Sequence, residues 1–317
     1  MAEKLLEINN LKKYFKTKKG MLHAIDDVSF YINKGETLGL VGESGCGKST
    51  TGRAILRLHE PTSGQVIYNN EDIVKYSAKK MKDMRRKMQI VFQDPYSSLN
   101  PRITVSELIA EPLYVNKIYK NNREIEARVK EVMETVGLEE RLINAYPHEL
   151  DGGRRQRIGI ARALALKPEF IVLDEPVSAL DVCIQAQILN LMNSLQKQFN
   201  LTYLFISHNL SVVKHVSDRI AVMYLGKIVE LSDYKSIFKN PLHPYTQALL
   251  SAIPIPKVDV EKEKIILEGD VPSPVDPPHG CRFYGRCNCK QDICKESTPK
   301  LRNIENERYV ACHFAGK

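Results

Sequence analysis

Residues 42–50 combine glycines, a lysine and hydroxyl side chains in the order of a phosphate-binding loop. They read Gly42-Glu43-Ser44-Gly45-Cys46-Gly47-Lys48-Ser49-Thr50. Glycines let successive backbone N–H groups turn toward phosphate oxygens, and a following helix N-terminus adds positive potential. In this pattern Lys48 reaches the β- and γ-phosphates, and the Ser49 hydroxyl can ligate Mg²⁺. The stretch therefore predicts a site for a nucleoside triphosphate.

A pair of carboxylates follows an apolar run further along the chain. Asp174 and Glu175 come directly after residues 170–173, which read Phe-Ile-Val-Leu. At the end of a buried strand, Asp174 can hold Mg²⁺ through water, and Glu175 can orient and deprotonate the water that attacks the γ-phosphate. The two motifs together predict hydrolysis of the bound triphosphate.

Alternating strands and helices must position these side chains. The apolar run at 36–41 predicts a buried strand before the glycine-rich loop, and residues 54–56 belong to the helix after it. Strands are also expected at 170–173, 203–206 and 220–223, with a helix at 184–199 between the first two. This alternation indicates an α/β class with a parallel sheet covered by helices.

Two segments depart from this alternation. Residues 106–166 have helical periodicity, and Gly137 stands where a helix C-terminal cap belongs. After about Pro241 the chain becomes rich in proline, which excludes long regular elements. We therefore expect a helical insert and a small appended module.

Composition limits the possible classes. The chain has 317 residues and 43% hydrophobic residues, enough to bury a sizeable core, and no apolar run long enough for a membrane span. Met1 to Lys4 lacks the layout of a signal peptide, so we expect a cytoplasmic location. The net charge of +8 is concentrated at 12–19 and 79–87. Neither run is interleaved with base-stacking aromatics, which favours solvated faces over nucleic-acid binding.

Further motifs resemble those of the ATP-binding cassette (ABC) ATPases. Besides the loop at 42–50 and Leu173-Asp174-Glu175-Pro176, these are Val91-Phe92-Gln93-Asp94-Pro95, Ser178-Ala179-Leu180-Asp181 and Ser207-His208-Asn209. They are similar, in order and spacing, to the family's glutamine loop, D-loop and histidine switch. The resemblance implies a P-loop cassette with a mixed sheet core and a helical subdomain at about 100–165, which binds ATP and Mg²⁺.

The resemblance also implies roles for single residues. Gln93 would sense the nucleotide, couple to a membrane partner and join Ser49 and Asp174 around Mg²⁺. His208 would contact the γ-phosphate as a catalytic residue beside Glu175. An aromatic residue before the first strands stacks on adenine in this family, and Phe15 is the best match, with Tyr14 as its rival.

The family's signature stretch is altered in this chain. Where a serine normally precedes two glycines, Asp151 precedes Gly152 and Gly153, and Arg154 replaces the glutamine that usually follows. In the family, that serine donates to the γ-phosphate held by a second cassette, and an ionised carboxylate cannot donate. We expect one weakened composite site in an asymmetric heterodimer. Asp is also as good a helix N-cap as Ser, so a purely structural role stays open.

The C-terminal part resembles ATPase subunits of bacterial peptide and nickel importers. The resemblance is carried by Asn240-Pro241-Leu242-His243-Pro244-Tyr245-Thr246-Gln247-Ala248-Leu249-Leu250 and by Asp270-Val271-Pro272-Ser273-Pro274. The sequences of the P-loop and of residues 92–101 resemble those of the second, F-type of the two ATPases in oligopeptide and dipeptide permeases. The expected cassette domain covers 1–250 and the expected extension 251–317.

This resemblance implies a set of partners and a location. They are a second, D-type ATPase, two transmembrane permease subunits and, indirectly, an extracellular substrate-binding protein, with this chain peripheral on the cytoplasmic face of the membrane. Nickel or metallophore import is the alternative to peptide import. A soluble ABC ATPase that acts on nucleic acid or the ribosome is a more distant alternative. Such proteins usually carry a long inserted coiled coil or two cassettes, and this chain has one P-loop, so we expect no nucleic-acid partner.

Five of the seven cysteines are concentrated near the C-terminus. Cys281-x5-Cys287-x6-Cys294-x17-Cys312 is similar to a pattern that holds a [4Fe–4S] cluster in some importer ATPases. Four thiolates suit that cluster or tetrahedral Zn²⁺, and spacing alone does not choose between them or exclude an unmetallated loop. Cys289 is a spare thiol, and a reducing compartment disfavours disulfides.

Overall fold

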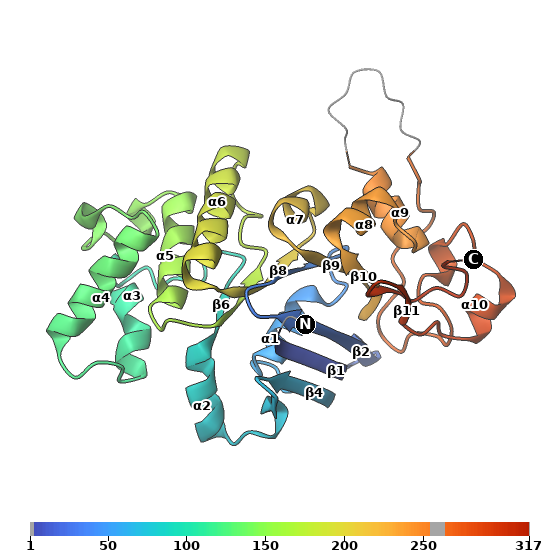
Figure 1. Cartoon of the computed structure of the whole chain (residues 1–317), viewed down its shortest axis with the longest axis horizontal. Helices are drawn as coiled ribbons and strands as arrows, with labels where there is room; N and C mark the ends of the chain where they lie inside the picture. Colours follow the sequence, from blue (N-terminus) through green and yellow to red (C-terminus); the bar gives the residue numbers. More distant parts are fainter. Residues whose placement is uncertain (1–2, 254–263, 317) are drawn as a thin grey trace. The chain divides into compact units, whose positions relative to one another are not determined.

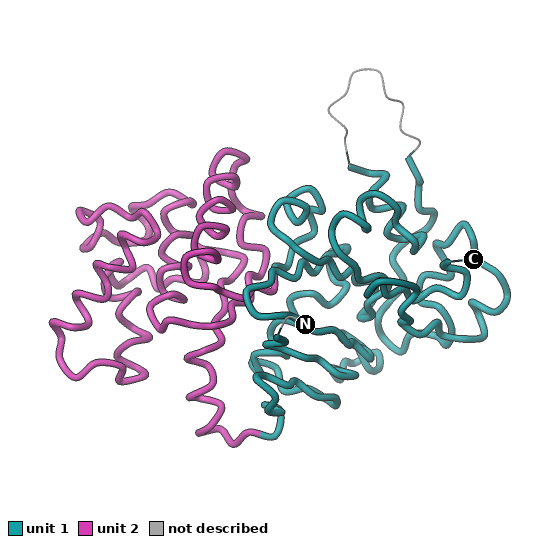
Figure 2. The backbone as a smooth tube through the Cα atoms, in the orientation of Figure 1, with its two compact units in different colours: residues 1–75, 205–317 teal, residues 76–204 magenta. Residues whose placement is uncertain are grey.

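A computed structural model describes residues 3–253 and 264–316. The chain forms two compact units, coloured separately in Figure 2. Unit 1 contains residues 1–75 and 205–317, and unit 2 contains residues 76–204. The chain passes between them within strand β8, Thr202–Ser207. The P-loop and the C-terminal extension therefore belong to the same unit.

Unit 1 begins with an antiparallel sheet in the order β2-β1-β4-β5 (Figure 1). The strands are β1 (Lys4–Thr17), β2 (Gly20–Asn33), β4 (Ser63–Tyr68) and β5 (Glu71–Asp72). The sequence prediction did not include these strands. Several register shifts interrupt the pairing of β1 with β2, so the apolar residues of β1 do not keep a strict alternation.

The second sheet of unit 1 is mixed and follows the order β11-β12-β10-β9-β3. β3 (Thr37–Val41) and β9 (Arg219–Tyr224) are parallel and fully buried, and β10 (Lys227–Asp233) returns antiparallel to β9. The extension supplies β11 (Arg302–Glu305) and β12 (Arg308–Val310), and β12 pairs with β10. The extension thus continues the cassette's own sheet.

Short helices complete unit 1 (Figure 1). They are α1 (Lys48–Ile55), α7 (Leu210–Val216), α8 (Tyr234–Lys239), α9 (Pro244–Ser251) and α10 (Asp292–Glu296), with the 3₁₀ turns η1 (Ile73–Lys75) and η4 (Tyr284–Arg286). α7 packs against β3, and α8 packs against β9 and β10. The short elements after residue 241 confirm the expectation drawn from the prolines.

Unit 2 is mostly helical. Its elements are α2 (Ala78–Lys87), β6 (Met88–Val91), α3 (Val105–Val115), α4 (Asn122–Thr135), η2 (Glu140–Leu142), η3 (Pro147–Glu149), α5 (Gly152–Leu164), β7 (Phe170–Asp174) and α6 (Val182–Phe199). β6 and β7 are parallel, and α5 packs against α3, α4, α6 and β6.

Local signals explain where the helices of unit 2 begin and end. A capping box of Thr104 and Glu107 starts α3, and the Asn121 side chain caps α4. Gly137, at φ +68°, follows the C-cap of α4 in the left-handed region, as expected. The predicted helical insert and the strands expected at 36–41, 170–173, 203–206 and 220–223 are confirmed.

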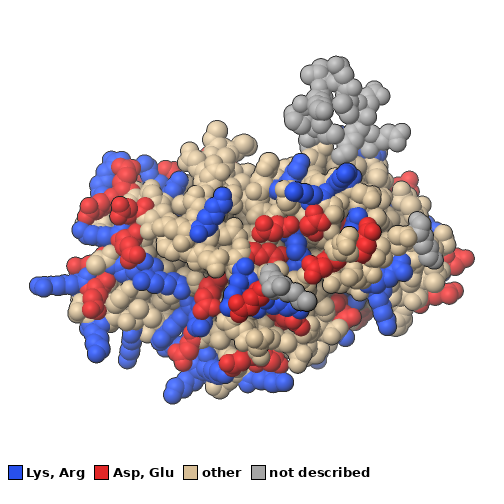
Figure 3. All heavy atoms as spheres, viewed as in Figure 1, with Lys and Arg blue, Asp and Glu red and all other residues tan. Residues whose placement is uncertain are grey.

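The excess positive charge is dispersed on the face that Figure 3 shows, where Lys and Arg side chains alternate with Asp and Glu. The basic run 79–87 forms most of α2, and Met81 is its one buried residue. This run is a solvated helix face, as predicted. Among the residues that the structure describes, no helix is long and apolar enough to cross a bilayer.

Candidate nucleotide-binding site

The P-loop lies between β3 and α1, and Lys48 crosses it from the first turn of the helix. The Lys48 ammonium donates to the backbone oxygens of Gly42 at 2.8 Å and Glu43 at 3.0 Å, and the residue is only 4% exposed. These bonds hold the loop closed around the start of α1. An ammonium fixed there is placed to exchange carbonyl partners for phosphate oxygens.

The glycines of the loop have two different functions. A Cβ atom on Gly42 would lie 2.1 Å from the Met223 carbonyl oxygen, and one on Gly47 would lie 2.1 Å from that of Ala24. Both positions therefore need glycine because the backbone is packed closely against neighbouring backbone. At Gly45, by contrast, φ is +79° and a Cβ atom would meet nothing within 4 Å. The loop is open at Gly45, where a phosphate can approach.

Two side chains that the sequence did not predict hold Glu43, the second residue of the loop. Its backbone N–H donates to the Tyr245 hydroxyl at 2.9 Å, and its carboxylate pairs with the Arg286 guanidinium at 2.8 Å. Tyr245 lies in the first turn of α9, and Arg286 ends η4 in the extension. No local pattern could have revealed these contacts, because 202 and 243 residues separate the partners.

The two candidates for adenine stacking differ in their surroundings. The Tyr14 hydroxyl donates to Asp26 at 2.5 Å, and its ring stacks on His23 with centroids 4.0 Å apart. Burial and this bond raise the pKa of the Tyr14 phenol. The half-buried Phe15 ring meets His59 edge-on at 5.6 Å. Tyr14 is thus committed to a polar network, which favours Phe15 as the stacking residue.

In unit 2 the predicted Mg²⁺ ligand Asp174 and the predicted base Glu175 lie at the end of β7. Asp174 is buried at the end of the strand, 1% exposed. Glu175 comes next, with φ +48° in the left-handed region, where a non-glycine residue costs about 1–3 kcal/mol. The Gln93 amide donates to Glu175 Oε2 at 3.0 Å. The glutamine loop and the predicted base are therefore brought together.

The altered signature forms the N-terminus of α5. Asp151 is the N-cap, and its carboxylate accepts the Arg154 N–H at 2.8 Å. The Arg154 guanidinium pairs with the same carboxylate at 3.1 Å and reaches Glu139 at 3.4 Å. The capping role considered from the sequence is confirmed, and Arg154 offsets part of the negative charge.

The two signature glycines and the D-loop pack against each other within unit 2. A Cβ atom on Gly153 would lie 2.7 Å from Ile184 of α6, and one on Gly152 would lie 3.1 Å from Leu180. Asp181 caps α6 by accepting the Ile184 N–H at 3.0 Å. Close packing thus explains both glycines, and capping gives Asp181 a structural role.

The remaining predicted residues are divided between the units. His208 is exposed directly after β8 and belongs to unit 1 with the P-loop. Gln93, Asp174 and Glu175 belong to unit 2. The proposed Mg²⁺ ligands Ser49, Gln93 and Asp174 stay a prediction. Serine, amide and carboxylate oxygens are the donor chemistry that Mg²⁺ prefers.

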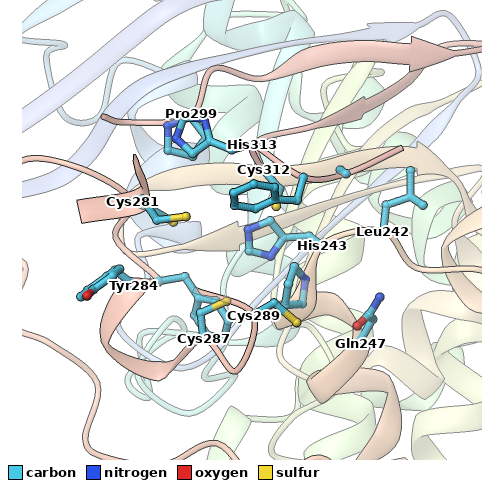
Figure 4. A pocket seen from close by; sticks show the side chains of 15 residues that line it. Leu242, His243, Gln247, Cys281, Tyr284, Cys287, Cys289, Pro299, Cys312 and His313 are labelled. Carbon is cyan, nitrogen blue, oxygen red and sulfur yellow. The ribbon is translucent and has the colours of Figure 1, made fainter. Parts of the chain in front are cut away.

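The five C-terminal cysteines line one cavity of about 160 Å³ in unit 1. Figure 4 shows Cys281, Cys287, Cys289 and Cys312 around it, together with His243 and His313. Cys294 lines the cavity as well. The five cysteines thus share one cavity.

The cavity does not have the geometry of a metal centre. Among residues 3–253 and 264–316, no three His, Cys, Asp or Glu side chains lie close enough together to hold one metal ion. Burial raises the pKa of the Cys281 thiol to about 11 and that of Cys287 above its usual value. Without a cation these thiols are protonated and pack as small apolar groups. The [4Fe–4S] cluster and the Zn²⁺ alternative are thus not supported here, although the donor chemistry suits both.

Comparisons with known proteins identify the family. Residues 25–178 match the model of the ABC transporter family, and residues 229–294 match the C-terminal region of oligopeptide/dipeptide transporters. The chain is 52% identical to the oligopeptide transport ATP-binding protein AppF of Bacillus subtilis over 98% of both proteins. This chain belongs to the oligopeptide-transporter family of ABC ATP-binding proteins.

Other members and solved cassettes agree with this assignment. The oligopeptide transport ATP-binding protein OppF of Bacillus subtilis is 60% identical over 84% of this chain and 87% of its own length. A dimeric post-hydrolysis structure of the cassette MJ0796, bound to ADP and phosphate, has a TM-score of 0.66 at 30% identity. It covers 72% of this chain and 98% of that one. CbiO1 from Clostridium perfringens has a TM-score of 0.67 at 27% identity and covers 75% of this chain and 92% of its own.

Family membership fixes the activity and the fold class. As an ABC ATP-binding protein of this family, the chain is an ATPase whose hydrolysis is coupled to transport. The expected α/β cassette is likewise confirmed by its likeness to solved ABC cassettes. Residues 229–294, which match the transporter C-terminal model and include the first part of the extension, belong to the same compact unit as the P-loop.

Proposed function

We propose that this chain powers the import of short peptides, with two permease subunits and an external substrate-binding protein as partners. The observation that carries the proposal is the match to AppF, an oligopeptide transport protein by name, which extends through the extension to 98% of the chain. The chain itself would be peripheral on the cytoplasmic face of the membrane. Cargo would contact the binding protein and the permeases instead of this subunit.

The expected roles of the site residues follow the family pattern. The P-loop from Gly42 to Thr50 binds the phosphates, with Lys48 on the β- and γ-phosphates and Ser49, Gln93 and Asp174 around Mg²⁺. Glu175 activates the attacking water, and His208 contacts the γ-phosphate. Phe15 stacks on adenine. The bond from Gln93 to Glu175 supports a pair that acts together.

The proposed partner in the ATPase dimer is a different, D-type subunit. Asp151 supports this proposal, because its carboxylate accepts bonds from the Arg154 backbone and guanidinium and has no hydrogen to donate. Facing a γ-phosphate at about 4 Å, an uncompensated carboxylate would oppose binding by roughly 4 kcal/mol at an effective dielectric of 20, and the Arg154 guanidinium would reduce this cost. The composite site with Asp151 would be degenerate, and the site with Glu175 and His208 of this chain would be competent.

Peptide import is tested on the assembled transporter. The chain is co-expressed with its permease subunits and second ATPase, reconstituted in vesicles, and supplied with a labelled short peptide or Ni²⁺ and the binding protein. We expect ATP-dependent uptake of peptide that Lys48→Ala abolishes and Lys290→Ala preserves. Uptake of Ni²⁺ without peptide uptake would instead support the nickel alternative and refute peptide import.

Asymmetry is tested by removing one catalytic base at a time. Glu175→Gln and the corresponding change in the second ATPase are compared in the same complex, with Glu169→Gln as the control. Glu169 is an exposed partner of Lys87 in the same unit, so its change should leave hydrolysis intact. We expect Glu175→Gln to remove most ATPase activity and the partner's change to remove much less. Equal losses would contradict the proposal.

For the extension we propose that Cys281, Cys287, Cys294 and Cys312 bind a [4Fe–4S] cluster, with Zn²⁺ as the alternative. The cavity that these cysteines share supports the proposal. The distances between their thiols do not, because among the described residues no three possible ligands lie close enough together to hold one metal ion. The protein is purified without oxygen, and its iron, zinc and visible absorbance are measured alongside Cys294→Ser. Iron and a broad visible band that the variant loses would support the cluster, zinc alone would support the alternative, and neither metal would refute both.

A further inference from the structure

An ion pair within unit 1 joins the extension to the P-loop. The Arg286 guanidinium lies 2.8 Å from Glu43 Oε2, and the two side chains are 10% and 26% exposed. Such a pair is screened less by water than a surface pair and is strengthened by its hydrogen bond. Glu43 is the residue after Gly42, at the start of the loop that must hold the phosphates of ATP.

The segment that carries Arg286 is held firmly on both sides. Phe283 is 1% exposed and packs against Tyr224 at 5.2 Å and Tyr245 at 5.5 Å between ring centroids. Tyr245 in turn accepts the Glu43 N–H. Arg282 donates to the Leu225 carbonyl, one residue before Gly226, whose N–H donates to the Cys46 carbonyl at 2.8 Å.

The same segment lines the cysteine cavity. Phe283 and Tyr284 line it, and Cys281 and Cys287 stand at the two ends of the segment. Residues 281–287 are therefore one short piece of chain with thiols on one side and P-loop contacts on the other. A structural change in the cavity would be transmitted to Glu43 through this packed segment, because no hinge lies among the described residues between the cavity and Glu43.

The charge of Glu43 gives this contact a chemical consequence. A carboxylate in the P-loop repels the phosphates of ATP, which carry the same sign. Arg286 compensates that charge and fixes the carboxylate away from free rotation. Lys48, whose ammonium is bonded to the Glu43 carbonyl oxygen, depends on the same peptide for its position.

We propose that Arg286 is a positioning residue for ATP binding: it neutralises and orients Glu43, so that the cysteine-lined extension sets the affinity of the P-loop. The residue contacts the loop and acts through Glu43 on the bound nucleotide. Arg286 should therefore control the binding of Mg-ATP and have little effect on the chemical step.

The test measures binding and catalysis separately. In the full chain, Arg286→Ala should raise the Kd for a fluorescent Mg-ATP analogue about tenfold. In the assembled transporter, the same change should raise KM for ATP by a similar factor and change kcat by less than about twofold. Arg286→Lys, which keeps the charge, should recover most of the affinity. This split would not arise from a general loss of fold.

Two further variants identify the cause. Lys290→Ala removes a positive charge from the same loop; Lys290 is exposed and lies over Tyr284, so the affinity should not change. Adding Glu43→Gln to Arg286→Ala should restore affinity, because the repelling carboxylate is gone, and high salt should reduce the defect of the single variant.

Three outcomes would overturn the proposal. The first is a lower melting temperature of Arg286→Ala with unchanged Kd, which would make Arg286 purely structural. The second is an equal loss of affinity in Lys290→Ala, which would indicate a general field of positive charge. The third is a double variant as weak as Arg286→Ala. Should Arg286→Ala fail to fold, Arg286→Lys and the double variant still decide the question.

Discussion

At the scale of single residues, Asp151 separates a structural role from a chemical one. Its carboxylate caps α5, a task that Ser performs equally well, yet it cannot donate to a phosphate. The cap explains why aspartate is tolerated at the start of the helix. Under the proposed function, the missing donor would affect only the nucleotide bound by the second ATPase of the dimer.

Restoring serine should revive that contact. In a complex already carrying Glu175→Gln, Asp151→Ser should raise the remaining ATPase activity roughly tenfold, since a hydroxyl donor replaces a like charge. Stability should stay within about 0.5 kcal/mol because the cap is kept. Asp151→Ala serves as the control, which removes the charge without adding a donor. Equal activity of the Ser and Ala variants would show that no donor is needed.

Asp26 leads to a second prediction at the residue scale, which concerns the pH dependence of stability. Burial opposes its charge, yet bonds from Tyr14 at 2.5 Å, Lys227 at 3.3 Å and Arg282 outweigh burial and lower its pKa. A lowered carboxyl pKa gives stability that is complete above the unfolded value of about 3.9 and lost as pH falls through the folded value. Asp26→Asn should therefore cost about 1–3 kcal/mol at pH 7.

The measurement is urea unfolding of both proteins at pH 7 and near pH 3, below the unfolded carboxyl value of about 3.9. The gap between wild type and Asp26→Asn should narrow at the lower pH, because the wild-type carboxylate is losing its advantage there. Asp270→Asn, at an exposed carboxylate of unit 1, is the control and should show no gap at either pH. A gap that is constant with pH would mean that packing, and not charge, explains the cost.

At the scale of elements, two of the three glycines in α5 should respond to alanine in opposite ways. A Cβ atom on Gly153 would meet Ile184 at 2.7 Å, whereas one on Gly159 would meet nothing within 4 Å. Gly153→Ala should cost about 1–3 kcal/mol through overpacking. Gly159→Ala should raise the free energy of unfolding by about 0.5–1 kcal/mol, because alanine loses less backbone entropy than glycine when the helix forms. Chemical unfolding of the two variants checks both signs, and destabilisation by both would contradict the packing argument.

The elements that sequence predicted best are those with local signals. β3 and α1 flank a glycine-rich motif, β7 is a continuous apolar run, and α4 ends at Gly137. The sequence did not predict β1 and β2. Bulges interrupt the alternation of apolar and polar residues in β1, and several lysines lie toward its C-terminal end. Chain-local patterns carry no information on such irregular pairing.

The residues of the candidate site also divide into those that a local sequence pattern predicts and those that it does not. The P-loop, Asp174, Glu175 and the cysteine cluster were predicted from spacing, since each is a short motif or a tight group in the sequence. Arg286 and Tyr245 were not, because they reach Glu43 across more than two hundred residues. The spacing of the cysteines in the sequence also does not predict whether Cys281 and its neighbours bind metal. Metal binding depends on how closely the thiols approach one another in the folded protein.

At the scale of the whole molecule, the extension is part of the cassette unit. β12 extends the sheet from β10, where Glu230 is fully buried and accepts the backbone N–H groups of Leu242 and His243 at 2.9 Å. Arg308 of β12 lies 3.5 Å from the same carboxylate. Because a buried carboxylate needs a compensating charge, β10 depends on the extension for stability.

This dependence predicts that the P-loop and the extension unfold together. Cys46 in the P-loop and Cys294 in the extension are both buried, at 3% and 7% exposure, so each thiol reports on its own region. In the full chain, labelling of the two by a thiol reagent should begin at the same urea concentration. Arg308→Ala should cost about 3 kcal/mol and shift both labelling curves together, because Glu230 is left uncompensated in one cooperative unit. Exposed Cys183 is the internal control, labelled without urea. Labelling of Cys294 well before Cys46 would show that the extension opens independently and would contradict this prediction.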